Sequence, residues 1–202
     1  MTEAALKTEI SAEDRMRVEL YDFLAALLAA PPLDGLLRQC AKLTGDATLL
    51  GEAIGLLSKL AGKTTAPTAE REFNNLFIGM GRGELLPYAS YYMTGFLNEK
   101  PLAQLRRDMA EYSIKRAPNV YEPEDNIASL MEMMAGLIDG RFGEPASLSQ
   151  QQTFFSRHIS PWAGHFFADL EGAKTSVFFV PVGTIGRHFM EIEREAFRLG
   201  GN

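Results

Sequence analysis

Residues 121–140, YEPEDNIASLMEMMAGLIDG, place three acidic residues around one proline and continue as a methionine-rich apolar run. Pro123 suits the first position of a helix, because a residue there needs no N–H donor. Glu124 and Asp125 would then lie in the first turn, where their charges oppose the positive end of the helix dipole. Glu122 would occupy the capping position, which Ser, Asp or Asn fill better. The stretch therefore predicts a helix that starts at Pro123.

Helical periodicity extends outward from this stretch over most of the chain. Ser11 precedes a run of apolar residues at spacings of three and four, which Pro31 and Pro32 stop: Met16, Leu20, Phe23, Leu24, Leu27 and Leu28. Further helices are predicted over residues 35–44, from a cap at Asp46 to Leu60, over 68–80, and after Pro101, Ser147 and Ser160. One face of the 68–80 helix carries Phe73, Leu76, Phe77 and Met80. Core packing is predicted for Met131, Met133 and Met134 and for the stripe Phe154, His158, Trp162, Phe166 and Leu170.

Two segments depart from simple periodicity. Residues 81–100 show no sustained helical stripe, which predicts a long ordered loop of the kind that often carries function. Residues 175–199 begin with a β-branched and aromatic run, but no second segment offers a strand partner, so a helix kinked at Pro181 is favoured. The chain is therefore predicted to be an all-α, single-domain bundle over residues 1–202, with roughly eight to ten helices and a flexible N-terminus at residues 1–10.

Composition narrows the class of protein. With 26 acidic and 20 basic residues the formal net charge is −6, which disfavours nucleic acid and anionic membranes and favours basic partners. The single cysteine, Cys40, cannot form an internal disulfide and suits a reducing compartment. No apolar stretch approaches the roughly 18 residues of a membrane helix, and the N-terminus lacks the apolar run of a secretion signal. A cytoplasmic protein without stable membrane association is predicted.

The residues give no support for catalysis or for a bound metal or cofactor. None of the histidines at 158, 165 and 188 lies beside a second ligand at zinc spacing. Gly62-Lys63-Thr64 has the tail of a phosphate-binding loop, but Leu57 stands where that loop needs glycine. The glycines at 79, 81 and 83 follow a helix, whereas a dinucleotide-binding turn follows a strand. The sequence therefore predicts a protein that is not an enzyme.

Glu122, Glu124 and Asp125 leave two interpretations open. They are solvated charges at an ordinary helix start, or they form an acidic surface, with Tyr121 beside it, that receives a basic segment.

Three blocks in this order resemble the TorD/DmsD/NarJ family of redox-enzyme maturation chaperones. The first is Glu72-Phe73-Asn74-Asn75-Leu76-Phe77 followed by Pro87-Tyr88-Ala89-Ser90-Tyr91, and the second is Glu122-Pro123-Glu124-Asp125-Asn126-Ile127-Ala128. The third is the series Phe154, His158, Trp162 and Phe166. The likeness spans residues 15–195. One departure is Asn126, which replaces the histidine of the family signature and has no proton that titrates near neutral pH.

The resemblance implies an all-helical chaperone that binds the N-terminal segment, often a twin-arginine leader, of an apo molybdoenzyme. The chaperone would keep this catalytic subunit competent for insertion of molybdopterin guanine dinucleotide. The implied peptide-binding residues are Tyr88, Ser90, Tyr91, Tyr92, Glu122, Pro123, Glu124, Asp125 and Asn126. The run at 76–97, especially GRGELLPY, resembles members associated with formate dehydrogenases.

Two other classes of function stay open on the sequence. One is a GTP-binding regulatory protein, which the failed phosphate-loop spacing argues against, and the other is a structural subunit of an oxidoreductase. The expected assembly is a monomer or a dimer that swaps helices through a hinge at 79–100.

Overall fold

The computed structural model describes residues 10–118 and 120–200, and within them the chain is built from ten α-helices and two short π-helical segments. The first half contains α1 (Ala12–Ala29), α2 (Asp34–Cys40), α3 (Leu49–Ala61), α4 (Ala66–Phe73), η1 (Asn74–Ile78) and α5 (Ala89–Thr94). The second half contains α6 (Lys100–Glu111), α7 (Ile127–Asp139), α8 (Leu148–Phe154), η2 (Phe155–Ile159), α9 (Ala163–Gly172) and α10 (Val180–Gly200). No β-strand occurs in these ranges, so the predicted all-α class is confirmed. The flexible segment predicted at residues 1–10 lies, except for Ile10, outside the described residues.

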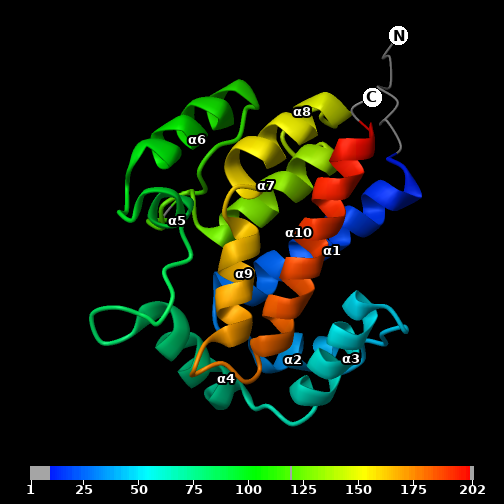
Figure 1. Ribbon diagram of the computed structural model, residues 1–202, viewed down its shortest axis with the longest axis vertical. Coiled ribbons are helices and arrows are strands. Elements are labelled where there is room, and N and C mark those ends of the chain that lie inside the picture. Colours follow the sequence, from blue (N-terminus) through cyan, green and yellow to red (C-terminus); the bar gives the residue numbers. More distant parts are fainter. Residues whose placement is uncertain (1–9, 119, 201–202) are drawn as a thin grey trace.

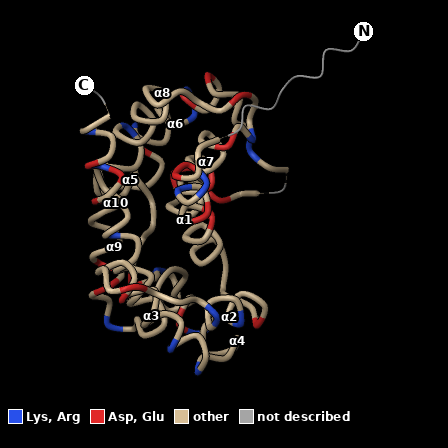
Figure 2. The backbone as a smooth tube through the Cα atoms, turned by 90° about the vertical axis from the view of Figure 1, so that its right-hand side faces the viewer, with Lys and Arg blue, Asp and Glu red and all other residues tan. Residues whose placement is uncertain are grey.

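The long helices run side by side through the middle of the molecule (Figure 1). Helix α1 packs along α7, and α10 packs along α9 and also against α3. Helices α2, α3 and α4 gather at one end, while α5, α6 and α8 lie toward the other (Figure 1). Acidic and basic residues are interspersed along the chain (Figure 2). Within residues 10–118 and 120–200, no helix combines the length and apolar character needed to span a membrane.

Helix α7 occupies the centre of the core because its sequence is apolar on nearly every side. The predicted burial of Met131, Met133 and Met134 is confirmed. The stripe Phe154, His158, Trp162, Phe166 and Leu170 is also buried. His158 Nε2 lies 2.7 Å from Asp108 Oδ2, and Trp162 Nε1 donates to the carbonyl oxygen of His158 at 2.8 Å. These bonds satisfy the polar atoms that the apolar stripe carries into the core.

Helix α1 is capped as predicted but rotated relative to the predicted face. Ser11 Oγ accepts a hydrogen bond from Asp14 N at 3.0 Å. Met16, predicted in the core, is 62% exposed, and Val18 and Tyr21 point inward instead. Tyr21 is fully buried because its hydroxyl has a buried partner, the carboxylate of Glu193. The predicted face did not include Tyr21, whose polar hydroxyl enters the core only because Glu193 accepts its hydrogen bond.

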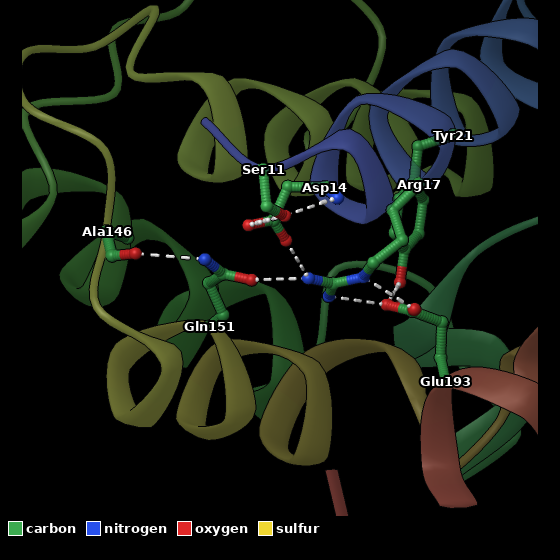
Figure 3. A network of polar contacts seen from close by, with 7 residues as sticks. All are labelled: Ser11, Asp14, Arg17, Tyr21, Ala146, Gln151 and Glu193. Carbon is green, nitrogen blue, oxygen red and sulfur yellow. Dashed lines mark hydrogen bonds and ion pairs between the residues drawn. The ribbon is translucent and has the colours of Figure 1, made fainter. Parts of the chain in front are cut away.

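A buried polar network joins α1 to α8 and α10 (Figure 3). Arg17 donates to both carboxylate oxygens of Glu193, at 2.7 and 2.8 Å, and Tyr21 donates to the same carboxylate at 2.8 Å. The guanidinium of Arg17 also reaches Gln151 Oε1 at 2.9 Å and Asp14 Oδ1 at 2.8 Å. Glu193 is 1% exposed, so its charge depends on these donors. The network fixes the start of α1 against the C-terminal half of α10.

Several predicted helix ends were wrong. Thr48 rather than Asp46 caps α3, and Asp46 instead accepts a hydrogen bond from the Thr48 N–H. The 35–44 helix ends at Cys40. The 68–80 helix ends at Ile78, because Gly79 takes a φ of 62°, and Met80 is fully exposed. The predicted loop at 81–100 contains the short helix α5.

The last helix begins later than predicted and is not kinked at proline. Helix α10 starts at Val180, so Pro181 lies in the first turn, where it disrupts no helical hydrogen bond. Two glutamate carboxylates accept hydrogen bonds from backbone N–H groups in the segment before this helix. Glu72 Oε1 accepts from the N–H groups of Val177 and Phe179 at 2.7 and 3.0 Å, and Glu84 accepts from Lys174 N at 2.6 Å. These bonds replace a helical turn before Val180.

Helix α10 packs closely against the backbone of α9 at Gly183. A Cβ atom at Gly183 would lie 2.6 Å from Glu171 N and 2.7 Å from Phe167 O, both backbone atoms. We expect Gly183→Ala to lower the free energy of unfolding by about 1–3 kcal/mol, because one backbone must move. Gly55→Ala in α3 meets no atom within 4 Å, so it is expected to raise the free energy of unfolding by about 0.5–1 kcal/mol. Urea unfolding of both variants checks the opposite signs, and equal effects would contradict this packing.

Candidate functional site

The segments around Tyr88 and Asn126 lie side by side although they come from separate parts of the chain. They form an isolated antiparallel bridge. Their backbones exchange two hydrogen bonds, from Ala89 N to Asp125 O at 3.0 Å and from Ile127 N to Pro87 O at 2.9 Å. The PYAS and EPEDN sequences therefore build one structural unit, which we call the paired segments (residues 87–90 and 122–127).

The pairing overturns the prediction that a helix starts at Pro123. Helix α7 begins at Ile127, and Asn126 is its cap, with Oδ1 accepting from Ala128 N at 2.9 Å. Residues 123–126 form a turn, closed by a hydrogen bond from Asn126 N to Pro123 O at 3.1 Å. Glu124 and Asp125 therefore lie before the helix and not in its first turn. Asn126 caps well because its short amide oxygen reaches the free N–H groups of the first turn.

Asp125 and Ser90 lie inside the paired segments rather than on the surface. Asp125 is 1% exposed, and its Oδ2 atom accepts a hydrogen bond from Ser90 N at 2.8 Å. Ser90 is fully buried. The carboxylate thus stabilises the start of α5, which explains why a helix forms within the predicted loop.

The carboxylate of Glu124 already forms ion pairs with two arginines of this chain. Its Oε2 atom accepts from Arg106 at 2.8 Å, and Arg116 lies 3.6 Å from Oε1. Burial acts to raise the pKa of Glu124, but the hydrogen bond from Arg106, a backbone hydrogen bond and the charges of Arg106 and Arg116 together lower it. Of the predicted acidic residues, Glu122 is the exposed one. A basic partner would meet Glu122 first.

Tyr88, Glu122 and Asn126 line a cavity of about 360 Å³, which we call the acidic groove. Its apolar lining comes from α1, α4, η1, the paired segments and the loop before them: Leu28, Phe73, Phe77, Ile78, Pro87 and Val120. The Tyr88 hydroxyl donates to Glu122 Oε1, and burial together with this hydrogen bond raises the pKa of Tyr88. Glu132 supplies a second carboxylate, and burial raises its pKa. The groove combines apolar walls with carboxylates.

Tyr91 and Tyr92 lie on α5 and do not line the acidic groove. The Tyr92 hydroxyl donates to Asp169 Oδ2 at 2.8 Å, and its ring packs 5.4 Å from that of Trp162. The Arg82 guanidinium lies 5.1 Å from the centre of the Tyr91 ring. Pro123 is partly buried in the turn and does not line the groove. Of the nine predicted residues, Tyr88, Glu122 and Asn126 line the groove. Pro123, Glu124 and Asp125 belong to the turn before α7, Ser90 bonds to Asp125, and Tyr91 and Tyr92 contact Arg82 and Asp169.

The segments that suggested nucleotide loops lie at helix ends. Gly62 closes α3, and Gly79 ends η1, so both follow helices rather than strands. Among the residues that the structure describes, no group of three His, Cys, Asp or Glu side chains is placed to hold a metal ion.

The model of a known protein family, described as "Nitrate reductase delta subunit", matches residues 43–168. This match covers more than half of the chain, including both paired segments. The chain belongs to this family. The resemblance that the three sequence blocks indicated is thereby confirmed at the level of the family.

Similar proteins agree with this membership. A protein of Aliivibrio fischeri named "Chaperone protein TorD" is 28% identical over 179 residues, which cover 78% of this chain and 83% of the relative. A TorD chaperone of Vibrio cholerae is 33% identical over 102 residues, 47% of this chain and 46% of the relative. A solved structure from Archaeoglobus fulgidus, assigned to redox enzyme maturation, has a TM-score of 0.55 at 18% identity and covers 94% of this chain and 99% of that one. At this identity the structural likeness shows a shared fold.

The groove of this family member includes residues that the sequence analysis did not place in the site. Phe73 and Phe77 belong to the first family block and form part of the apolar wall of the groove. Glu132 was missed, although Asn126, Ser129 and Glu132 stand at spacings of three and so share one face of a helix. That spacing was readable in the sequence, but only the fold shows that this face of α7 borders a cavity.

Proposed function

We propose that this family member is a cytoplasmic chaperone for a molybdoenzyme. It binds the N-terminal segment of the apo catalytic subunit, including a twin-arginine leader where one is present, and has no turnover of its own. The bound subunit stays competent to receive molybdopterin guanine dinucleotide before assembly or export. Membership of the family and the likeness to TorD chaperones support the class of function. The acidic groove supports a basic, partly apolar segment as the ligand.

The groove carries the proposal because its chemistry complements a basic amphipathic peptide. Glu122 is exposed at the groove, and its carboxylate, already bonded to Tyr88, has capacity for further donors such as a guanidinium. Phe73, Phe77 and Val120 offer apolar contacts beside it. Peptide recognition commonly combines an apolar groove with a few fixed polar groups. A leader with arginines next to an apolar stretch has both features.

Formate dehydrogenase is the client that we propose. The support is the run at 76–97, whose GRGELLPY sequence resembles members associated with those enzymes. The groove is lined by four residues of this run, Phe77, Ile78, Pro87 and Tyr88. The segment that resembles formate dehydrogenase-associated members therefore also forms part of the proposed binding surface.

Reversing the charge of the groove is expected to weaken leader binding. We expect Glu122→Lys to lower the affinity for a twin-arginine leader peptide of a molybdoenzyme at least about tenfold, because the peptide's arginines would meet a like charge. Glu70→Lys makes the same charge change at an exposed position of α4 outside the groove and is expected to bind almost normally. Isothermal titration of both variants measures the difference. Equal affinities for the two variants would remove the groove as the binding site.

A further inference from the structure

The acidic groove continues into a second cavity, of about 160 Å³, which we call the side pocket. Four residues line both cavities, and we call the place where they stand the junction: Val120, Glu122, Ser129 and Glu132. The apolar walls of the side pocket come from α6, α7 and the segments that follow them: Met109, Ile114, Ala117, Met133 and Phe142. Apolar walls therefore lie on both sides of the junction.

The side pocket has the size of one apolar side chain. An apolar cavity of roughly 150 Å³ can hold a benzene ring. Met109, Ile114 and Met133 are buried, and Phe142 is partly buried beside them. A phenyl or aliphatic group that enters would leave water for these walls, which favours binding.

Glu132 stands at the junction without a partner in the described chain. It is exposed, so a bound group can reach it, and it forms no hydrogen bond or ion pair within residues 10–118 and 120–200. Partial burial and the charge of Asp22 raise the pKa of Glu132. Arg141 acts in the opposite direction, but its guanidinium is already paired with Asp22 and Asp139. A cation from a ligand would therefore stabilise the charged form of Glu132.

The neighbouring charges favour a cation at the junction and an uncharged group in the side pocket. Glu122 adds a second exposed carboxylate, which is bonded to the hydroxyl of Tyr88. Arg116 lines the side pocket, but it lies 3.6 Å from Glu124 Oε1 and donates to the carbonyl oxygen of Glu122 at 2.6 Å. Lys115 lines the side pocket and is exposed, so it would repel a second cation there.

We propose that Glu132 determines specificity in the acidic groove by binding an arginine of the bound segment, while the side pocket takes an apolar side chain of the same segment. A second apolar side chain, on the other side of the arginine, contacts the wall that contains Phe73 and Phe77. Side chains two positions apart point the same way in an extended segment, so the three groups can enter together. This inference rests on the proposed function, because it specifies which basic segments the groove accepts.

The probe for the side pocket is an acetylated nonapeptide with a central arginine, phenylalanine two positions before and after it, and glycine and serine elsewhere. NMR titration of the full chain measures its affinity. Alanine in place of either phenylalanine is expected to weaken binding at least about fivefold, because the burial of one ring is lost. The amide shifts of Met133 and Phe142, which line the side pocket alone, should respond to the peptide with two phenylalanines. Equal affinities with one and two phenylalanines, or no saturable binding up to about 1 mM, would overturn the side pocket.

A protein variant tests Glu132 at constant size. Glu132→Gln is expected to weaken the arginine peptide roughly three- to tenfold, because a charged acceptor is lost. The weakening should disappear for a peptide with glutamine in place of the arginine, which a loss of folded structure would not produce. Glu70→Gln, an exposed position of α4 outside both cavities, is expected to bind normally. Equal affinity of Glu132→Gln and Glu70→Gln for the arginine peptide would overturn the role of Glu132.

A twin-arginine leader peptide of a molybdoenzyme separates this inference from the proposed function. If the leader is weakened by Glu122→Lys but binds Glu132→Gln as tightly as the unchanged chain, the groove stands and the role of Glu132 is overturned. If the leader does not bind the unchanged chain, leader binding itself is overturned. The inference predicts that both variants weaken the leader and that Glu70→Gln does not.

Discussion

Replacement of Arg17 by methionine is expected to lower the free energy of unfolding by about 3–5 kcal/mol. The methionine keeps the length and apolar stem of the side chain but leaves Glu193 without its cation. Glu193 is 1% exposed and would retain Tyr21 as a donor, so its charge would be buried and largely uncompensated (Figure 3). The loss also releases Gln151 and Asp14, which hold α8 and the start of α1 to the same guanidinium.

An exposed ion pair on α10, the helix that carries Glu193, provides the control. Arg198 pairs with Glu195 on α10, and both side chains are more than half exposed. Arg198→Met is expected to change the free energy of unfolding by at most about 1 kcal/mol, because solvent screens such pairs. Urea denaturation of both variants gives the comparison. Similar losses in the free energy of unfolding of the two variants would show that burial does not determine how much the Arg17 network contributes to stability.

Replacement of Trp162 by alanine is the second change with a large expected effect, a loss of about 3–5 kcal/mol in the free energy of unfolding. The side chain is 1% exposed and packs against the rings of Tyr92 and Phe166. Its removal would open a cavity between α5, η2 and α9 and leave the His158 carbonyl oxygen without the indole donor. The third family block is thus a structural element that positions α5, and through it one of the paired segments.

Thermal or urea unfolding of Trp162→Ala measures this contribution. Tyr121→Ala is the matched aromatic control, because Tyr121 is 88% exposed and its truncation is expected to change stability by less than about 0.5 kcal/mol. A Trp162→Ala variant as stable as Tyr121→Ala would contradict the role of the stripe as core.

The existence of most helices could be predicted from apolar spacing, because burial of one face is the main force that holds a helix in a bundle. Their ends could not, because these depend on partners distant in sequence. Pro123 marks a plausible helix start, yet the N–H group of Ile127 bonds to Pro87, and residues 123–126 form a turn before α7 begins. Likewise, Glu72 holds the backbone of Val177 and Phe179, which delays α10 to Val180.

The π-helical segments also limited prediction from periodicity. Both η1 and η2 lie within family blocks and insert an extra residue into the helical turn. The face predicted through Phe73 and Phe77 does not reach Met80, because η1 ends at Ile78 and Gly79 turns the chain. A count of 3.6 residues per turn cannot anticipate such an insertion.

The candidate site was predicted in part. The sequence blocks identified Tyr88, Glu122 and Asn126, which the fold brings to one groove. They also identified Ser90, Glu124 and Asp125, which the structure buries, because a motif records shared positions without distinguishing contact with a partner from support of the fold. Asp125 supports the fold, since its Oδ2 atom accepts a hydrogen bond from Ser90 N at the start of α5.

The most direct test of the proposed chaperone function is affinity purification of the tagged chain from a lysate of its native cells, followed by mass spectrometry and molybdenum analysis of the bound proteins. We predict recovery of a molybdoenzyme catalytic subunit without its cofactor, and its loss when the bait carries Glu122→Lys but not Glu70→Lys. Recovery of only the mature, cofactor-loaded enzyme, or of no molybdoenzyme at all, would contradict a chaperone that binds the subunit before cofactor insertion.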